Sequence, residues 1–471
     1  MTSTANAPKN IDELKKLLEG DTKVKVAVDG VLRGKYMSRD KFINAATDST
    51  GFGFCSVIFG WDIHDQVYSR ELLISNKANG YRDVLAIVDL STYRRIPWED
   101  NVPFFLVSFL DFDSLKPLPV CPRSVIATAV RSAEKDGWRC IAGLEYETAH
   151  TIAEKKFTNP TPLTPGMHGY SLLRTQLNQT YFNDIFNQSL KFGIEIEGHH
   201  TETGPGVYET ALAYTDASRM ADNATLFKFV TKSVGMAHQI IPSFMAKPWG
   251  NLPGCSGHIH VSLRTADGKN LFAVKESELM NGRAGAANSD TRFISKEAEY
   301  FLAGVLAGLE DVMPMLVPTI NGYKRLVGGE SFWAPNAVTY GYDSRAASVR
   351  IISPPSCPSS GTRFEVRITG ADINPYFALA TIFLLGLRGI RRKIPLTTPP
   401  MSQIGDDRSK VTKLSTSLEE ATIKMMKPTS IAREILGNEF VEHFGGTREH
   451  EVKLWNEAVT NWEVERYLEL V

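Results

Sequence analysis

The chain has 471 residues, and its 52 Lys and Arg residues balance 53 Asp and Glu residues to give a formal net charge of −1. This balance provides no basic surface for nucleic acid or for an anionic membrane, so we expect neither partner. Hydrophobic residues make up 43% of the chain, which excludes a largely disordered protein. The five cysteines are scattered without a CxxC pair, so we expect neither a disulfide framework nor a thiolate zinc site.

The first 110 or so residues predict a small domain rich in β-structure. A short amphipathic helix over residues 11–18, capped near Asn10, precedes the strand-like segments. These segments cover residues 24–28, 84–89 and 104–109. A proline-rich stretch at residues 116–123 follows and is the best candidate for a domain boundary.

Helices alternate with strands in the remainder of the chain. The predicted helices cover residues 124–136, 170–192, 226–245 and 298–312. The most apolar stretch, residues 376–387, is too short to span a bilayer, so it predicts a buried helix. The polar N-terminus lacks the apolar core of a signal peptide, and we expect a cytoplasmic protein.

Functional side chains recur at every second position in several predicted strands. Glu145 and Glu147 would share one face of a strand, because successive side chains on a strand point to opposite faces. An isolated pair of this kind is usually solvent-exposed, but the pattern is repeated along the chain. The other members of the pattern are Glu195 with Glu197, His258 with His260, and Arg363 with Glu365 and Arg367.

These residues suit a metal-assisted phosphoryl transfer. Carboxylates with an imidazole favour Mg²⁺ or Mn²⁺ over a structural zinc ion. Four arginines fall within 23 residues, and guanidinium groups are the usual ligands of phosphate and carboxylate groups. They are Arg345, Arg350, Arg363 and Arg367. A metal site beside these arginines favours chemistry on a metal-bound nucleotide such as ATP.

The order of the motifs resembles the glutamine synthetase family from about residue 17 to the C-terminus. The matching segments are Gly143 to Glu147, Glu197 to Glu202 with Gly204-Pro-Gly206 and Glu209, Ser256 to Leu263, Asn321 to Val327, Ser344 to Pro375, and Leu414 to Ala421. The resemblance implies an α+β protein with a small N-terminal β-grasp domain at residues 17–112. A large catalytic domain with a curved antiparallel sheet would occupy residues 113–471. It also implies a homo-oligomer of stacked rings, with active sites between subunits.

The resemblance also implies a role for each matching residue. Glu147, Glu202 and Glu209 would hold one metal ion, and Glu145, His258 and Glu365 would hold a second. Arg325 and Arg367 would bind the glutamate carboxylate, together with the backbone of Gly254. Arg345 and Arg350 would act on the phosphoryl group, with Arg350 also on the nucleotide side beside Ser262 and Arg363.

Two departures from the family pattern concern the amine. The segment at residues 51–57, which would enter the neighbouring subunit's site, has no acid where glutamine-forming members hold ammonium, and Phe54 is the nearest match. Trp333, not glutamate, precedes Ala334-Pro335, and Glu330 is displaced. An ammonium ion stripped of water needs carboxylate partners. Phe54, Phe332 and Trp333 would instead suit an organic amine, although core packing or a subunit contact would also explain them.

The sequence therefore predicts an ATP-dependent ligase that joins the γ-carboxylate of glutamate to an alkyl or aryl amine through a γ-glutamyl phosphate. One alternative is a true glutamine synthetase, which would hold ammonia with Glu330. A second alternative is a non-catalytic relative with a structural role. Retention of all six metal-ligand candidates argues against that second alternative.

Overall fold

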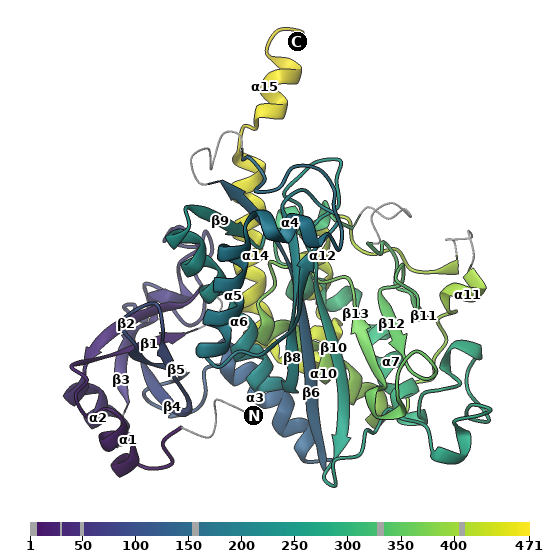
Figure 1. Ribbon diagram of the computed structural model, residues 1–471, viewed down its shortest axis with the longest axis horizontal. Helices are drawn as coiled ribbons and strands as arrows, with labels where there is room; N and C mark the ends of the chain where they lie inside the picture. The colour runs from purple at the N-terminus through teal and green to yellow at the C-terminus, as the bar shows by residue number, and fades with distance from the viewer. Residues whose placement is uncertain (1–6, 29–30, 48–50, 153–159, 327–333, 405–409) are drawn as a thin grey trace.

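The computed structural model describes residues 7–28, 31–47, 51–152, 160–326, 334–404 and 410–471. The N-terminal part forms one side of the molecule, and a large sheet with its helices forms the rest (Figure 1). Among the described residues, no helix combines the length and apolar character needed to cross a membrane.

The N-terminal part is a five-stranded sheet with two helices. Helix α1 (Ile11–Leu17) begins after Asn10, whose side chain accepts a hydrogen bond from the Glu13 backbone N–H, so the predicted helix start is confirmed. The strands lie in the order β2-β1-β5-β4-β3, with β1 and β5 parallel and the other neighbours antiparallel. The elements after α1 are β1 (Lys23–Val28), β2 (Arg33–Ser38), α2 (Arg39–Thr47), β3 (Phe52–Cys55), β4 (Asp83–Ile96) and β5 (Val102–Leu110). The β-grasp topology and the boundary at residue 112 stay predictions.

The second sheet has eight strands and carries the candidate site. Seven of them follow the order β11-β12-β13-β10-β6-β8-β7, and β9 pairs with β6. We expected an antiparallel sheet, and its neighbours are antiparallel except for β11 and β12, which run parallel. The strands are β6 (Trp138–Ile152), β7 (Ile196–Thr201), β8 (Val207–Asp216), β9 (Ile240–Ser243), β10 (Gly257–Thr265), β11 (Tyr340–Tyr342), β12 (Val349–Ile352) and β13 (Arg363–Val366).

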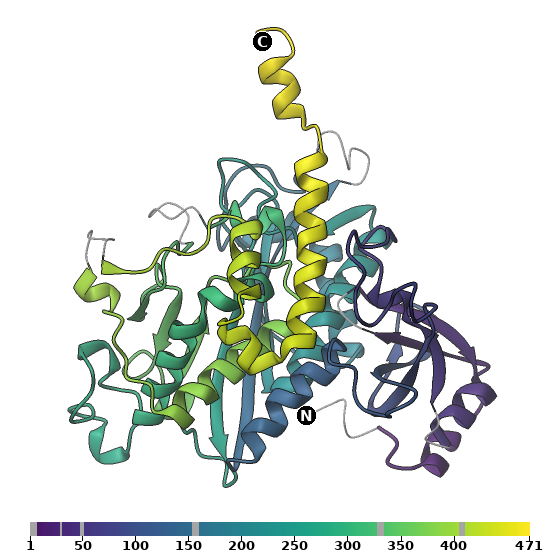
Figure 2. The same cartoon turned by 180° about the vertical axis from the view of Figure 1, so that it is seen from behind.

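Helices cover one face of this sheet, and α14 runs across the back of the molecule (Figure 2). The last helix, α15, projects away from the body toward the C-terminus. The helices are α3 (Pro122–Glu134), α4 (Leu172–Leu177), α5 (Gln179–Lys191), α6 (Ala217–Ala237), α7 (Lys296–Gly308), α8 (Met313–Leu316), α9 (Ile320–Tyr323), α10 (Pro375–Arg392), α11 (Met401–Ile404), α12 (Leu418–Met426), α13 (Ile431–Leu436), α14 (Asn438–Glu457) and α15 (Asn461–Tyr467). The buried helix predicted from the apolar stretch is confirmed as α10.

Two predicted helices differ from the structure. The predicted helix over residues 170–192 is divided into α4 and α5 at Asn178, whose backbone (φ −129°, ψ 36°) leaves the helical region. The predicted helix over residues 226–245 is wrong at both ends, because α6 begins at Ala217 and ends at Ala237. Gln239 then adopts a left-handed conformation (φ 57°), and the chain continues into β9, where Pro242 has no N–H to donate to a helix.

Candidate active site

Along three neighbouring strands, successive side chains point alternately to the hydrophobic core and to the candidate site. Leu144 and Tyr146 on β6 are buried in the main hydrophobic core, as are Ile259 on β10 and Phe364 on β13. The side chains at the intervening positions point to the opposite face of the sheet. These are Glu145 and Glu147 on β6, His258 and His260 on β10, and Arg363 and Glu365 on β13. The predicted alternation is confirmed for these pairs, whereas Arg367, which the prediction also includes, lies just beyond the end of β13.

Strand register places these side chains in a continuous row. Glu209 on β8 lies opposite Glu147 on β6, and Glu145 lies opposite His258 on β10. The row continues across β13, because His260 lies opposite Glu365. Glu365 in turn lies opposite Arg350 on β12. Residues from four distant parts of the chain therefore meet on one face.

The residues of this row other than His260 line a cavity of about 460 Å³. The cavity brings together most of the residues to which the sequence assigns a role in metal binding, glutamate binding or phosphoryl transfer. They are Glu145, Glu147, Glu202, Glu209, Gly254, His258, Arg325, Arg345, Arg350, Glu365 and Arg367. Gly254 packs closely against Arg325, since a Cβ added at Gly254 would lie 2.9 Å from Cγ of Arg325.

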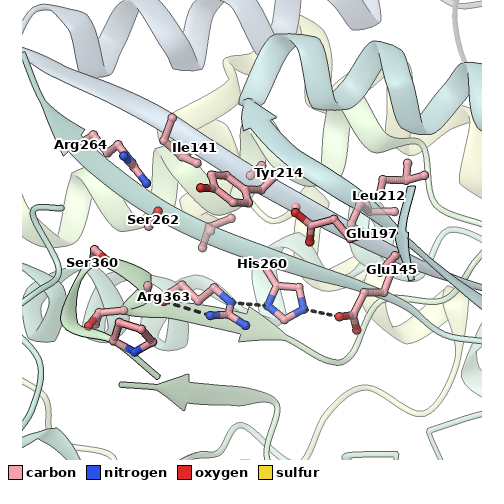
Figure 3. Close-up of a pocket in the computed structure, with 18 residues that line it drawn as sticks. Ile141, Glu145, Glu197, Leu212, Tyr214, His260, Ser262, Arg264, Ser360 and Arg363 are labelled. Carbon is pink, nitrogen blue, oxygen red and sulfur yellow. Dashed lines mark hydrogen bonds and ion pairs between the residues drawn. The ribbon is translucent and has the colours of Figure 1, made fainter. Parts of the chain in front are cut away.

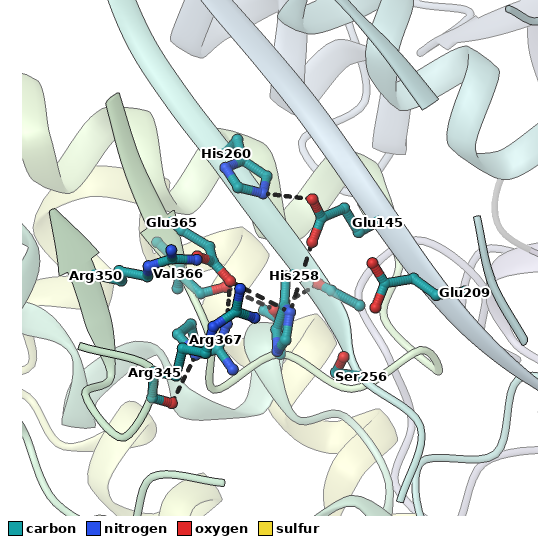
Figure 4. Close-up of polar contacts among 12 residues, drawn as sticks. Glu145, Glu209, Ser256, His258, His260, Arg345, Arg350, Glu365, Val366 and Arg367 are labelled. Atoms are coloured by element: carbon teal, nitrogen blue, oxygen red, sulfur yellow. Dashed lines mark hydrogen bonds and ion pairs between the residues drawn. The ribbon is translucent and has the colours of Figure 1, made fainter. Parts of the chain in front are cut away.

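Backbone and side-chain contacts hold the arginines in place. Arg325 Nη2 donates to the backbone oxygens of Ile368 (2.6 Å) and Thr369 (2.9 Å) just beyond β13. Arg367 Nε donates to the backbone oxygen of Arg345 (2.9 Å), and its Nη1 contacts Glu365. Arg350 Nη1 donates to Oε2 of Glu365 at 2.9 Å, so Glu365 bridges two arginines (Figure 4).

Glu145 and Glu365 lie in an electropositive part of the cavity. Burial would raise the pKa of Glu145, but contacts with His258 and His260 outweigh burial and lower it well below its usual range. Burial also opposes ionisation of Glu365, whereas His258 and Arg367 lower its pKa to about 2. The pKa of His258 is lowered to about 4 by burial and by Arg367, so its imidazole is neutral and can act as a ligand.

Glu147 and Glu209 lie in the opposite environment. Burial and the charge of Glu209 raise the pKa of Glu147 to about 7, although its side chain accepts a hydrogen bond from the Ser256 N–H. Burial likewise raises the pKa of Glu209. Carboxylates gathered in a buried cavity either bind a proton or are compensated by a cation. The donor set therefore fits a divalent ion that prefers oxygen ligands.

Among the residues that the structure describes, two groups of side chains have ligand atoms close enough to share an ion, with the ligand atoms of each group within 4.8 Å of one another. One group is Glu145, His260 and Glu365, and the other is His200, Glu202 and Glu209. Each group contains two of the three residues that the sequence predicts as ligands of one metal ion. His258 and Glu147, the remaining members, line the same cavity, so the complete ligand sets stay predictions.

A second cavity, of about 300 Å³, adjoins the first at Glu145 (Figure 3). Ser262 and Arg363, two of the three residues that the sequence predicts on the nucleotide side, line it, whereas the third, Arg350, lines the first cavity. The nucleotide roles of these three residues stay predictions.

Sequence reasoning missed several residues of the two cavities. Glu197 and His260 belong to the alternating pattern but received no role, and Tyr214 and Arg264 had no recognisable signal. Tyr170 lines the larger cavity and stacks on His200 with ring centroids 4.4 Å apart. A β-bulge at Glu197 could not be predicted, since β7 pairs Ile196 with Leu212 and then Gly198 with Ala211.

Of the four residues predicted to contact the amine, Phe54 lines neither of these cavities in its own chain. Phe54 lies on β3 of the N-terminal sheet, where its ring packs edge-on against Phe109 and the Lys35 ammonium lies 4.8 Å from its centroid. Glu330, Phe332 and Trp333 lie outside the described residues. The amine contacts of all four residues therefore stay predictions.

Comparison with known proteins agrees with this geometry. Residues 119–467 match the model of the glutamine synthetase catalytic domain. The chain belongs to the glutamine synthetase family. The resemblance inferred from the motif order is confirmed, as is the prediction of an ATP-dependent ligase of this type.

Two relatives in the glutamine synthetase family carry different activities in their names. The chain is 41% identical to type-1 glutamine synthetase 2 of Dictyostelium discoideum, over 95% of this chain and 84% of the relative. It is 33% identical to glutamate–isopropylamine ligase of Pseudomonas sp, over 95% of this chain and 94% of the relative. A solved structure of GmaS with ADP matches with a TM-score of 0.78, covers 97% of this chain and 99% of that one, and has 23% identity. It therefore supports the fold.

Proposed function

We propose that this enzyme joins the γ-carboxylate of glutamate to an organic amine, alkyl or aryl, in preference to ammonia. ATP would activate the carboxylate as a γ-glutamyl phosphate, and the amine would then displace phosphate to give a γ-glutamyl amide. This order is required because a carboxylate is too poor an electrophile to accept an amine directly.

The arrangement of the arginines supports this chemistry. Arg325 and Arg367 line the larger cavity, where backbone contacts hold them, and would bind the glutamate α-carboxylate. Arg345 and Arg350 would neutralise charge on the moving phosphoryl group. Mg²⁺ or Mn²⁺, held by the carboxylates and His258, would supply further charge neutralisation when bound. Ser262 and Arg363 would contact the nucleotide in the adjoining cavity.

The observation that carries the amine preference is the missing acid in residues 51–57. A cation as small as ammonium recovers the free energy of dehydration only from paired carboxylates, whereas an apolar amine gains about 25 cal/mol for each Å² of apolar surface buried. The isopropylamine ligase of Pseudomonas sp supports the same preference. The ring of Tyr170 adds an aromatic surface to the cavity wall beside Glu202 and Glu209.

A true glutamine synthetase is the second candidate. The name of the Dictyostelium relative, at 41% identity, favours it. In this case Glu330, from the longer segment before Ala334-Pro335, would hold ammonium from a shifted position. The non-catalytic alternative is set aside, because the chain belongs to a family of ligases and its candidate ligands line one cavity.

We further propose that the active enzyme is a homo-oligomer of stacked rings. The segment that carries Phe54 lies in the N-terminal sheet and not at the cavity of its own chain. A second copy would bring this segment over the cavity and exclude water, which would otherwise hydrolyse the acyl phosphate. Sedimentation should find no active monomer, and a fully active monomer would contradict this part of the proposal.

Trp333→Ala tests the amine site. We expect this variant to lower kcat/KM for the organic amine far more than it changes KM for glutamate or ATP, because only the amine would contact the indole. Trp462→Ala on the projecting helix α15 is the matched control and should leave all three values unchanged. An equal effect of Trp333→Ala on all three substrates would indicate a structural role for the indole.

A further inference from the structure

His260 lines the smaller cavity and lies next to Glu145, which lines both cavities. It is 9% exposed and lies on the site face of β10, opposite Gly143 on one side and Glu365 on the other. It lines the nucleotide-side cavity together with Arg363, and Glu145 is shared by both cavities. His260 is therefore placed between a residue of the nucleotide side and a candidate metal ligand.

The two ring nitrogens of His260 face different partners. Arg363 Nε donates a hydrogen bond to Nδ1 of His260 at 3.2 Å, and Nε2 of His260 lies 3.1 Å from Oε1 of Glu145 (Figure 3). A guanidinium can only donate, so Nδ1 must present its lone pair. The ring proton must then be carried by Nε2, which faces the Glu145 carboxylate.

The second oxygen of Glu145 faces His258, which the sequence predicts as a ligand of the same metal ion. Its Oε2 lies 3.8 Å from Nδ1 of His258, which in turn lies 3.4 Å from Oε1 of Glu365 (Figure 4). Thus Oε1 is directed to His260, and Oε2 is directed to the other members of the predicted ligand set. A carboxylate that binds a metal ion is usually oriented by such an outer partner.

We propose that His260 is a positioning residue that orients Glu145 for metal binding, and that Arg363 fixes the tautomer of His260 required for this. The Arg363–His260–Glu145 relay would make the metal site depend on a residue of the nucleotide side even when no nucleotide is bound. This inference rests on the metal role of Glu145 and does not depend on which amine is used.

The first test measures Mn²⁺ binding by electron paramagnetic resonance of the free ion, with full-length protein and without ATP, glutamate or amine. In His260→Asn, the amide oxygen can still accept from Arg363 but nothing reaches Glu145. In His260→Gln, the amide nitrogen can occupy the place of Nε2. We expect His260→Asn to weaken one class of Mn²⁺ site roughly 10- to 100-fold, and His260→Gln to restore most of that affinity.

Equal losses in both variants would overturn the proposal, because they would make His260 a direct metal ligand, as its grouping with Glu145 and Glu365 allows. His238→Asn is the matched control. It removes a histidine–carboxylate contact of 2.7 Å with Asp184, and Mn²⁺ binding should not change. Since no turnover is measured, failure of the relay is distinguishable from failure of the proposed amine reaction.

The second test asks whether removal of an arginine strengthens or weakens Mn²⁺ binding. Removing a positive charge near a metal site should strengthen cation binding by Coulomb's law. The relay predicts the opposite for Arg363→Met, because the His260 tautomer is no longer fixed. Arg264→Met removes the same charge from the same cavity while leaving the Arg363–His260 contact intact.

Weaker Mn²⁺ binding in Arg363→Met, with unchanged or stronger binding in Arg264→Met, would support the relay. Stronger binding in both variants would overturn it. If Arg363→Met does not fold, as judged by circular dichroism, the comparison of His260→Asn with His260→Gln decides the question.

Discussion

Glu145 and Glu147 stand two residues apart on one face of β6, yet their surroundings shift their pKa values in opposite directions. His258 and His260 lower the pKa of Glu145 against the effect of burial, whereas burial and the neighbouring Glu209 raise the pKa of Glu147 to about 7. One carboxylate is stabilised as an anion by the protein itself. The other has no such compensation, so its charged form would be stabilised by a bound cation.

Substitution of Glu147 should therefore separate stability from activity. Glu147→Gln removes a buried like charge beside Glu209, so we expect the metal-free variant to melt at a higher temperature than the metal-free wild type at pH 8. The same variant should lose phosphate release, because a ligand of one metal ion is missing. Glu145→Ala should also abolish phosphate release but without this gain in stability. Full activity of either variant with the metal chelated would contradict the two-metal site.

Arg345→Lys should impair phosphoryl transfer more than nucleotide binding. An ammonium keeps the charge but cannot reproduce a planar, multidentate contact to the phosphoryl group. We expect kcat for phosphate release to fall roughly 100- to 1,000-fold, with a small change in KM for ATP. Steady-state phosphate release at varied ATP concentration measures both values, and a variant with nearly full kcat would exclude Arg345 from this role.

His443 should make the protein sensitive to acid. It is buried in α14, and burial lowers its pKa to about 4 from an ordinary value of about 6.5. Between these values the unfolded chain binds a proton that the folded protein does not, so stability falls as the pH falls. His443→Leu should remove roughly 1.4 kcal/mol of this loss for each pH unit. Denaturant titrations from pH 7 to about pH 4 measure how the free energy of unfolding changes with pH. His64→Leu, at an exposed histidine, is the control. The same pH dependence in wild type and His443→Leu would contradict this prediction.

Gly389 allows α10 to pack closely against α7. A Cβ at Gly389 would lie 2.1 Å from the Tyr300 carbonyl oxygen, and one at Gly304 would lie 2.3 Å from that of Leu385. Both contacts involve rigid backbone. Gly389→Ala should therefore lower the free energy of unfolding by about 1–3 kcal/mol. A Cβ at Gly250 would meet nothing within 4 Å, so Gly250→Ala is the control and should be nearly neutral. Thermal unfolding of the two variants measures the difference. An equal loss of stability in both variants would contradict the packing account.

The sequence predicted which side chains share a strand face, because alternation is a local property. It could not predict their partners across the sheet, since the register that places Glu145 opposite His258 depends on pairing between segments more than 100 residues apart. His260 shows the same limit. Its position in the pattern was visible, but its contacts with Arg363 and Glu145 come from two other strands.

Local conformations at single residues account for the misplaced helix ends. Asn178 and Gln239 leave the helical region within stretches whose apolar spacing favours a longer helix. Tyr170 also adopts a left-handed backbone (φ 57°) and enters the cavity from the turn before α4. Such positions depend on tertiary contacts, so apolar periodicity alone could not place them.

The preference for an organic amine is tested most directly by competition. The enzyme is supplied with glutamate, ATP and equal concentrations of ammonium and one amine from an alkyl and aryl panel, and the two amide products are quantified by mass spectrometry. The product ratio equals the ratio of the kcat/KM values. We predict that the γ-glutamyl derivative of an organic amine is the major product. Glutamine as the major product with every amine, and its selective loss in Glu330→Ala, would contradict the proposal and identify a glutamine synthetase.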